Sequence, residues 1–448
     1  MDFRFPDSFV WGAASSAYQI EAACDAGGKM PTVYDYYSKA KPDMFQEGGG
    51  PENAADFYHR YREDIAIMKK YGLKSFRFSI CWARIQSAVM GAPNEDGIAY
   101  YNGVIDCLME NGVIPFFDLY HCDLPMFVID KGGPTNPEFV DWFTDYARIC
   151  FRAFGERVKY WSVVNEPVLN VYGAYARENN GPFGNSMKDG LAASYHMMLA
   201  HYKTIKLYRE MGFDGKIGAV NHFIPTYAKT RSREDQEAAE RYREFYAGWW
   251  MEPMIKGTYP ELILREKEVR DLMPEGFAQG LRDAFEPMDF IGINYYNPAI
   301  IAYDSEGELR YRRLRDTGLP KDDYGFDRYL PSMFDTLMYV KNHYGNIPIF
   351  ITENGIGMAP PEDPLEDIND LYRVEYLREA LRELNRCMKA GVNVQGYYHW
   401  TFLDTYEGNT KGYKVRFGLV RIDTKTLERI PRKSLDYYRD VIESGFVE

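Results

Sequence analysis

The segment WSVVNEPVLN, residues 161–170, combines a strand pattern with a polar ending. The run from Trp161 to Val164 predicts a buried β-strand, because it is almost entirely apolar and rich in aromatic and β-branched residues. Asn165 and Glu166 follow at once, and Pro167 then removes a backbone donor, so the strand pattern stops there. A buried strand with this ending is expected to hold an amide and a carboxylate in fixed positions.

Seven other segments share the pattern of a short apolar or aromatic run followed by a helical period. The eight predicted strands are Val10–Gln19, Ser75–Ile80, Ile114–His121, Tyr160–Asn165, Lys216–Asn221, Phe290–Tyr296, Ile347–Glu353 and Val394–Phe402. Their near-continuous apolar character is typical of parallel strands that are covered on both faces.

Strands that alternate with helices from end to end, without a linker or low-complexity segment, predict an α/β fold. We expect a single (β/α)8 TIM barrel, one domain over residues 1–448, with its active site at the C-terminal ends of the strands. A doubly wound open sheet would usually carry a glycine-rich phosphate loop after an early strand, and the sequence has none there. The longer segments Pro42–Pro51 and Asp304–Pro331 are then excursions on the barrel rim.

Two of the predicted helices illustrate the helical pattern between the strands. In the first, Asn136 is expected to cap, Pro137 to occupy the first turn and Gly155 to end the helix. Its apolar face consists of Phe139, Phe143, Tyr146, Cys150 and Phe154. The next helix has a similar stripe, made of Leu191, Tyr195, Met198, Tyr202 and Ile205.

Charge and composition exclude several classes of protein. The net charge of −13 argues against a nucleic-acid partner, because phosphates demand a basic surface. No run approaches ~18 uninterrupted apolar residues, so we expect no membrane span. The amino end shows no secretory signal, and 6 scattered cysteines indicate reduced thiols in a cytoplasmic protein. We expect neither a metal nor a cofactor, since no metal-ligand spacing is recognisable. The sequence leaves the oligomeric state open.

Polar side chains occupy the predicted carboxyl ends of most strands. The set comprises Gln19, Arg77, His121, Asn165, Glu166, Asn294, Tyr296, Glu353 and Trp400. Glu166 and Glu353 are carboxylates on different strands, and in a barrel they would face each other across the mouth. Two such groups can flank a glycosidic bond, one as a general acid for the leaving oxygen and the other as a nucleophile at the anomeric carbon.

The neighbours of the two carboxylates predict their roles. Asn165 precedes Glu166 and can hold a substrate hydroxyl beside the bond. Arg77 and Tyr296 are expected beside Glu353, where a guanidinium and a phenolic hydroxyl would lower its pKa and suit a nucleophile. Carboxyl groups ~5–5.5 Å apart would imply retention of the anomeric configuration, whereas ~6.5–9.5 Å would imply inversion.

Motifs along the whole chain, in the same order, resemble those of the family 1 glycoside hydrolases, the β-glucosidase and β-galactosidase family. They are FPDSFVWGAASSAYQIE, YHRYREDIAIMKKYG, SFRFSICWARI, LYHCDLP, KYWSVVNEP, GINYYN, ITENG, and the late WTFLDTYEG and GYKVRFGLV. The resemblance implies a (β/α)8 barrel and a retaining β-glycosidase that forms a covalent glycosyl-enzyme. The implied partner is a small-molecule β-glycoside or oligosaccharide.

Transferred residue by residue, the resemblance implies that Glu166 is the acid/base and Glu353 the nucleophile. The other matches are Gln19, His121, Asn165 and Glu407 for the sugar hydroxyls, Trp400 for the aromatic floor, Asn294 and Tyr296 near the nucleophile, and Arg77 as its cationic neighbour.

Two positions depart from the family pattern. Family members usually have tryptophan where this chain has Cys122, and a Glu-Trp pair where it has Glu407 and Gly408. Both missing indoles would border the sugar. We therefore expect weak activity on plain β-glucosides and better activity on a modified or less common β-glycoside. The alternative is that another aromatic side chain, such as Tyr406 or Tyr413, fills the space and restores an ordinary pocket.

Two other functions stay open at this point, a 6-phospho-β-glycosidase and a sugar-binding barrel without catalysis. The 6-phospho branch of the family typically has serine where Glu407 stands, with a downstream lysine and tyrosine that hold the phosphate. Glu407 would repel a dianion, while the role of Lys414 is ambiguous because of a one-residue insertion before Gly412. The presence of both carboxylates and their polar neighbours argues against a barrel without catalysis.

Overall fold

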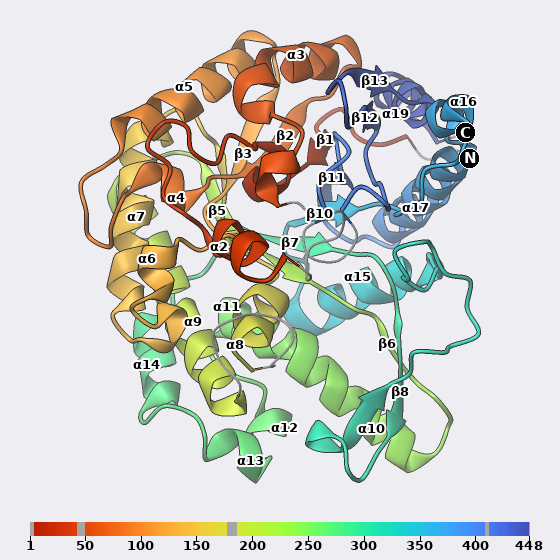
Figure 1. The fold of residues 1–448 in the computed structure, drawn as a ribbon. Helices are drawn as coiled ribbons and strands as arrows, with labels where there is room; N and C mark the ends of the chain where they lie inside the picture. The colour runs from red at the N-terminus through yellow and green to blue at the C-terminus, as the bar shows by residue number, and fades with distance from the viewer. Residues whose placement is uncertain (1–3, 43–49, 177–185, 408–411, 448) are drawn as a thin grey trace.

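The computed structural model describes residues 4–42, 50–176, 186–407 and 412–447. Its centre is a closed barrel of parallel strands in the order β1-β11-β10-β7-β5-β4-β3-β2, and Figure 1 shows the helices arranged around it. The barrel strands are β1 (Val10–Ala14), β2 (Ser75–Ser79), β3 (Ile114–Asp118), β4 (Tyr160–Asn165), β5 (Lys216–His222), β7 (Phe290–Asn294), β10 (Ile349–Asn354) and β11 (Val394–Trp400). The predicted (β/α)8 barrel is confirmed.

Helices of eight residues or more account for most of the outer layer. They are α2 (Val33–Ala40), α3 (Phe57–Lys70), α5 (Glu95–Glu110), α7 (Phe139–Phe154), α9 (Met187–Glu210), α10 (Arg233–Arg243), α11 (Trp249–Lys256), α14 (Phe277–Ala284), α15 (Pro331–Tyr344), α17 (Leu371–Lys389) and α19 (Lys433–Ser444). The shorter α-helices are α1 (Ala17–Ile20), α4 (Trp82–Ile85), α6 (Met126–Ile129), α8 (Ala174–Ala176), α12 (Glu261–Leu264), α13 (Lys267–Arg270) and α16 (Pro364–Asn369). Helical turns of other types are η3 (Pro51–Asn53), η4 (Gly133–Thr135), η5 (Val168–Gly173), η6 (Glu244–Gly248) and η7 (Glu308–Arg310).

The two predicted apolar helix faces are buried, on α7 and α9. Asn136 Oδ1 accepts a hydrogen bond from Glu138 N at 2.9 Å, just before α7 begins. Pro137 therefore precedes the first turn instead of occupying it, and Gly155 is the C-cap as predicted. These faces hold the helices against the strands by removing apolar surface from water.

Several strands end earlier than the apolar runs predict. β1 ends at Ala14, and Gln19 lies on the short helix α1, where Ala17 N donates to Ser79 Oγ at 2.9 Å. β3 ends at Asp118, three positions before His121. Hydrophobicity does not mark these ends because the segments that follow, at the barrel mouth, are buried as well.

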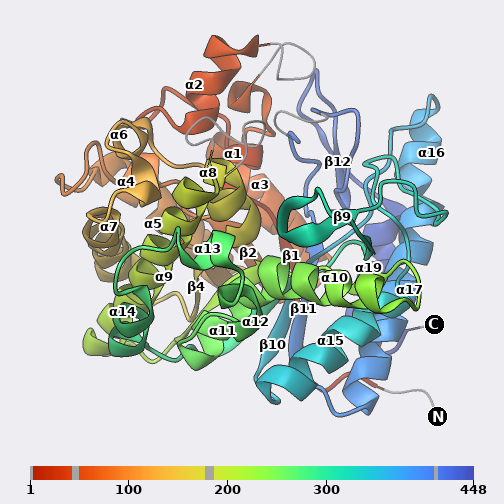
Figure 2. The same ribbon diagram turned by 90° about the horizontal axis from the view of Figure 1, so that it is seen from below.

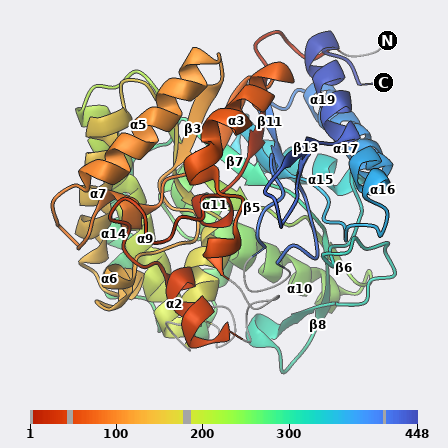
Figure 3. The same cartoon turned by 45° about the horizontal axis from the view of Figure 1, so that its top comes forward.

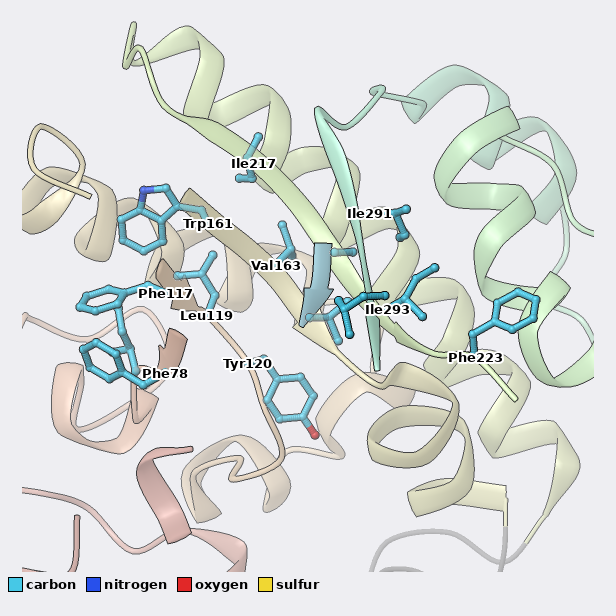
Figure 4. Close-up of a cluster of buried hydrophobic side chains, with 14 of the residues drawn as sticks. Phe78, Phe117, Leu119, Tyr120, Trp161, Val163, Ile217, Phe223, Ile291 and Ile293 are labelled. Carbon is cyan, nitrogen blue, oxygen red and sulfur yellow. The ribbon is translucent and has the colours of Figure 1, made fainter. Parts of the chain in front are cut away.

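Alternation along the strands divides the core into an outer and an inner part. Outward-facing side chains such as Phe117, Trp161 and Ile217 pack in the cluster between strands and helices (Figure 4). Inward-facing rings fill the barrel interior, where Phe116 and Phe290 pack edge to face with centroids 5.5 Å apart. The same alternation directs Arg77 and Asp118 into the interior, above these rings.

Additional segments surround the barrel. β6 (Thr226–Ala228), β8 (Ala299–Tyr303) and β9 (Tyr311–Arg313) form a small sheet, so the predicted rim excursion Asp304–Pro331 contributes one short strand. The hairpin of β12 (Val420–Ile422) and β13 (Arg429–Pro431) lies near α16, α17 and α19 (Figure 3). Most of the other predicted excursion, Pro42–Pro51, lies outside the described residues.

The first and last described segments of the chain lie side by side (Figure 2). Phe5 N donates to Gly445 O at 2.9 Å, and Tyr438 Oη of α19 donates to Gly12 O of β1 at 2.8 Å. In the part of the chain that the structure describes, no helix is long and apolar enough to cross a membrane. All the cysteines are free thiols.

Candidate active site

A β-bulge at the end of β4 brings two successive polar residues to the barrel mouth. Ser162 pairs with Gly218 of β5, but the next pair is Asn165 with Val220, so β4 contains one extra residue. Glu166 then has φ +45°, in the left-handed region, and its N–H donates to Val220 O at 2.9 Å. Backbone strain of this kind is concentrated at functional sites.

Glu166 and Glu353 line the same cavity, of about 230 Å³, at the mouth. They belong to opposite sides of the barrel, since β5 and β7 separate β4 from β10 on one side and four strands separate them on the other. Five of the other predicted site residues also line the cavity: Gln19, His121, Tyr296, Trp400 and Glu407. The remaining three are fully buried and form hydrogen bonds to lining residues: Arg77, Asn165 and Asn294.

Arg77 connects the side chains of Glu353, Asn165 and Asp118. Its Nη1 donates to Glu353 Oε1 at 2.7 Å, and its Nη2 donates to Asn165 Oδ1 at 2.7 Å. Its Nη2 is also 2.6 Å from Asp118 Oδ2, inside the barrel. One buried guanidinium therefore fixes Glu353 and the amide that precedes Glu166.

Glu353 accepts hydrogen bonds at both carboxyl oxygens. Arg77 bonds Oε1, and Tyr296 Oη donates to Oε2 at 2.8 Å. Burial raises the pKa of Glu353 above its usual range, while Arg77 acts in the opposite direction and the charge of Glu166 raises it further. The lowered pKa expected from the sequence is therefore wrong, because desolvation of the buried carboxylate outweighs the guanidinium.

Glu166 is held by a neutral amide. Asn294 is next to Glu353 in the β7–β10 register, yet its Nδ2 donates to Glu166 Oε1 at 2.9 Å. Thr352 Oγ1 donates to Asn294 Oδ1 at 2.7 Å, which fixes the orientation of the amide. Burial raises the pKa of Glu166, and the bond from Asn294 opposes the rise.

The remaining predicted residues form a polar group against an aromatic wall. The rings of His121 and Trp400 are stacked, with centroids 5.7 Å apart and planes at 11°. Gln19 Nε2 donates to Glu407 Oε1 at 3.3 Å. Burial raises the pKa of Glu407 to about 7, with a further contribution from Glu353. An aromatic face beside hydrogen-bonding groups suits a sugar, which has an apolar face and hydroxyl edges.

Cys122 lines the cavity, and two tyrosines that the sequence did not indicate stand beside it. Cys122 shares a hydrogen bond with Tyr34 of α2. Tyr34 stacks on Tyr18 of α1, with centroids 3.9 Å apart and planes at 14°. Phenol rings from the N-terminal segment, not an indole from the β3 loop, therefore border the cavity here.

The two tyrosines expected as alternatives occupy another place. Tyr406 and Tyr413 do not line the cavity; they pack in a separate buried cluster with Ala22 and Ala54, so neither of the two named tyrosines fills the space. Gly408 lies outside the described residues. Lys414 is exposed and is not among the residues that line the cavity.

The rest of the lining was missed in the sequence: Tyr18, Tyr34, Leu169, Asn170, His222, Tyr324, Phe326 and Phe417. His222 ends β5, so the signal that identified the other residues, a polar side chain at a strand end, applies to it too. The sequence pattern does not indicate it because the predicted strand stops at Asn221. Tyr324 and Phe326 belong to the rim excursion, whose path no periodic pattern predicts. Among the described residues, no three His, Cys, Asp or Glu side chains are grouped to hold a metal ion.

Comparison with known proteins gives matches over nearly the whole chain. A family model described as glycosyl hydrolase family 1 matches residues 1–446. The chain is 36% identical over 461 residues to the 6-phospho-beta-glucosidase GmuD of Bacillus subtilis strain 168, with 99% of each covered. It is also 36% identical over 447 residues to beta-glucosidase A of Acetivibrio thermocellus, with 98% of each covered.

Solved structures give the same result. A family 1 β-glucosidase from Thermotoga maritima superposes with a TM-score of 0.95 at 32% identity and covers 99% of each chain. A β-glucosidase from Thermotoga maritima in complex with deoxynojirimycin also gives a TM-score of 0.95 at 32% identity, with 99% of this chain and 100% of that chain covered.

Proposed function

The chain belongs to glycosyl hydrolase family 1 and is an O-glycoside hydrolase, and from this premise we propose that it is a retaining β-glycosidase for β-glucoside-like substrates with an uncharged glycone. The observation that carries the proposal is the difference between the hydrogen-bond partners of two carboxyl groups in one cavity. Glu353 is bonded to a guanidinium and a phenol, whereas Glu166 is bonded to a neutral amide. This difference favours an ionised Glu353 and a protonated Glu166.

The reaction proposed for this pair has two steps. Glu353 attacks the anomeric carbon while Glu166 gives its proton to the leaving oxygen, and the glycosidic C–O bond breaks. Glu166, now ionised, takes a proton from water, whose oxygen displaces Glu353 and restores the starting state. Because a charge on Glu166 raises the pKa of Glu353, a proton on Glu166 favours the ionised form of Glu353 before attack.

The relative named 6-phospho-beta-glucosidase makes a phosphorylated glycone the second candidate. The cavity is lined by the carboxyl groups of Glu166, Glu353 and Glu407 and, within the described ranges, by no lysine or arginine. Among the described lining residues, a phosphate dianion would meet like charges and no cation that compensates them. Lys414, the cation singled out in the sequence, is exposed. The described lining therefore favours an uncharged glycone.

Retention of configuration is the test of the proposed mechanism. We expect hydrolysis of a β-glycoside to release the β-anomer first, because two displacements at the anomeric carbon restore its configuration. Proton NMR, recorded faster than mutarotation, distinguishes the anomers. A first-formed α-anomer would mean that water attacks directly and that Glu353 is not a nucleophile.

Replacement of Cys122 tests the identity of the glycone. We propose that the wild type acts weakly on plain β-glucosides and better on a modified or less common glycone. Cys122→Trp should raise kcat/KM for a plain β-glucoside by about 2- to 10-fold, since a new indole adds apolar contact and one N–H donor. Cys122→Ala is the matched control and should leave the substrate preference unchanged. If the wild type already prefers plain β-glucosides and Cys122→Trp changes nothing, the idea of an altered glycone pocket is wrong.

We further propose that residues 1–448 form one catalytic domain in the cytoplasm. Barrel strands run from residue 10 to residue 400, and α19, near the end of the chain, is hydrogen-bonded to β1. The free thiols support a reducing compartment, where cysteines remain unpaired.

A further inference from the structure

His222, the last residue of β5, is a buried imidazole with one unused nitrogen. The residue is 6% exposed and lines the cavity together with Glu166, Tyr296 and Glu353. Its Nδ1 lies 2.9 Å from the hydroxyl of Tyr246. Its Nε2 is buried and has no hydrogen-bond partner among the residues that the structure describes. A buried polar atom without a partner is uncommon in native proteins and requires an explanation.

The position of His222 places it beside both carboxyl groups. In the β5–β7 register His222 is paired with Asn294, whose amide holds Glu166. The centroid of its ring is 6.0 Å from that of Tyr296, whose hydroxyl holds Glu353. His222 therefore adjoins the place where the glycosidic bond must lie.

His222 is also on the other side of the cavity from the polar group assigned to the glycone. Gln19, His121 and Glu407 follow β1, β3 and β11, which adjoin one another or are separated only by β2. β5 lies between β4 and β7, on the opposite arc of the barrel. If the glycone occupies the first side, the leaving group faces the second.

Apolar side chains line the same cavity as His222. Leu169 belongs to η5, which begins two positions after Glu166, and the ring centroid of Phe326 lies 5.4 Å from that of Tyr296. The side chains of Leu169 and Phe326 are half-buried. Burial lowers the pKa of His222 to about 4, so the imidazole is neutral near pH 7. A neutral imidazole offers Nε2 as a donor or an acceptor according to its tautomer, and a hydroxyl pairs with either.

We propose that His222 is a specificity-determining residue that hydrogen-bonds a hydroxyl of the leaving group, so that a second sugar unit is preferred over a flat aryl group without hydroxyls. The apolar side chains nearby would contact the C–H face of that sugar. Tyr246 is then a positioning residue, because its bond to Nδ1 fixes the plane of the ring. This inference rests on the proposed β-glycosidase function and concerns only the leaving-group side.

The test compares two substrates that share one glycone, cellobiose and 4-nitrophenyl β-glucoside. His222→Phe keeps a flat ring but removes Nε2, and should lower kcat/KM for cellobiose by about 3- to 10-fold, the effect of one lost hydrogen bond. The aryl glucoside should change by less than about 2-fold, because it has no hydroxyl for Nε2 to bind. His222→Gln, whose amide reaches a similar distance, should recover part of the preference for cellobiose.

His201 supplies a matched control, because it is a second buried histidine and does not line the cavity. Burial lowers its pKa to about 3. His201→Phe should affect both substrates alike. An equal loss on both substrates in His222→Phe, or no recovery in His222→Gln at an unchanged melting temperature, would overturn the role of His222.

A binding measurement separates this inference from the proposed function. Calorimetry with cellobiose can compare Glu353→Ala with Glu353→Ala/His222→Phe, and we expect the affinity of the double variant to be about 3- to 10-fold lower. Equal affinities would overturn the proposal for His222. If the wild type cleaved neither substrate while this difference in affinity remained, the proposed function would fail and the role of His222 in binding would stand.

Discussion

Glu353→Gly should lower turnover of β-glycosides by about four orders of magnitude or more, because the carboxylate that forms the covalent intermediate is removed. Binding of the sugar should remain measurable, since Gln19, His121 and Glu407 are unchanged. Steady-state kinetics and calorimetry check the two parts separately. A parallel loss of binding and turnover would mean that Glu353 holds the substrate and does not react with it.

Rescue by azide then distinguishes the nucleophilic carboxyl group from the acid/base. In Glu353→Gly, azide can enter the vacated space and attack an activated β-glycoside directly, which gives the α-glycosyl azide. In Glu166→Ala the covalent intermediate still forms from an activated substrate, and azide then gives the β-glycosyl azide. Glu353→Gln is the matched control, because its amide fills the space and should allow no rescue. The same anomer from both variants would contradict the assigned roles.

Arg77→Met should lower the free energy of unfolding by about 3–5 kcal/mol, because removal of one partner leaves buried charges uncompensated. Arg77 is fully buried. Its Nη1 is 2.7 Å from Glu353 Oε1, and its Nη2 is 2.6 Å from Asp118 Oδ2. Burial disfavours the ionised form of Asp118, yet Arg77 lowers its pKa below the usual value. Urea unfolding of the wild type and the variant measures the difference.

The pH dependence of this difference tests its electrostatic origin. A carboxyl whose folded pKa is depressed, such as Asp118, contributes stability above its unfolded pKa and loses it as the pH falls through the folded pKa. The loss of unfolding free energy in Arg77→Met should therefore be largest near neutral pH. It should shrink in acid, where the carboxyl groups of Asp118 and Glu353 become neutral. Arg233→Met, which removes an exposed ion pair with Glu237, should show no measurable change. A deficit that is constant with pH would indicate lost packing instead of unpaired charge.

The sequence was sufficient for features that depend on local pattern. The run before Asn165 predicted β4 with both its ends, because a buried strand must be apolar and a proline ends its pairing. The same reasoning placed Glu166 and Glu353 at the mouth, and the structure brings both to one cavity. A side chain at a strand end needs only the strand assignment to be located, since all strands of a parallel barrel end on the same side.

The ends of the apolar runs were less informative because burial continues past the strands. Gln19 was expected on a strand and lies on a helical turn, and His222 was missed because its strand is one residue longer than predicted. In both cases hydrogen bonding, which depends on the neighbouring strands, decides where the element stops.

Tertiary structure alone decided which groups meet and in which direction their pKa values shift. Asn294 is next to Glu353 in register but bonds Glu166, and Tyr34 comes from a distant segment to stand beside Cys122. The sequence suggested that Arg77 and Tyr296 would lower the pKa of Glu353, but burial raises it. Strand and helix patterns arise from residues a few positions apart, so the sequence by itself determined the barrel and its two carboxylates. Desolvation and hydrogen bonding between distant segments depend on the packing of the whole barrel mouth, and these decided the chemistry of the site.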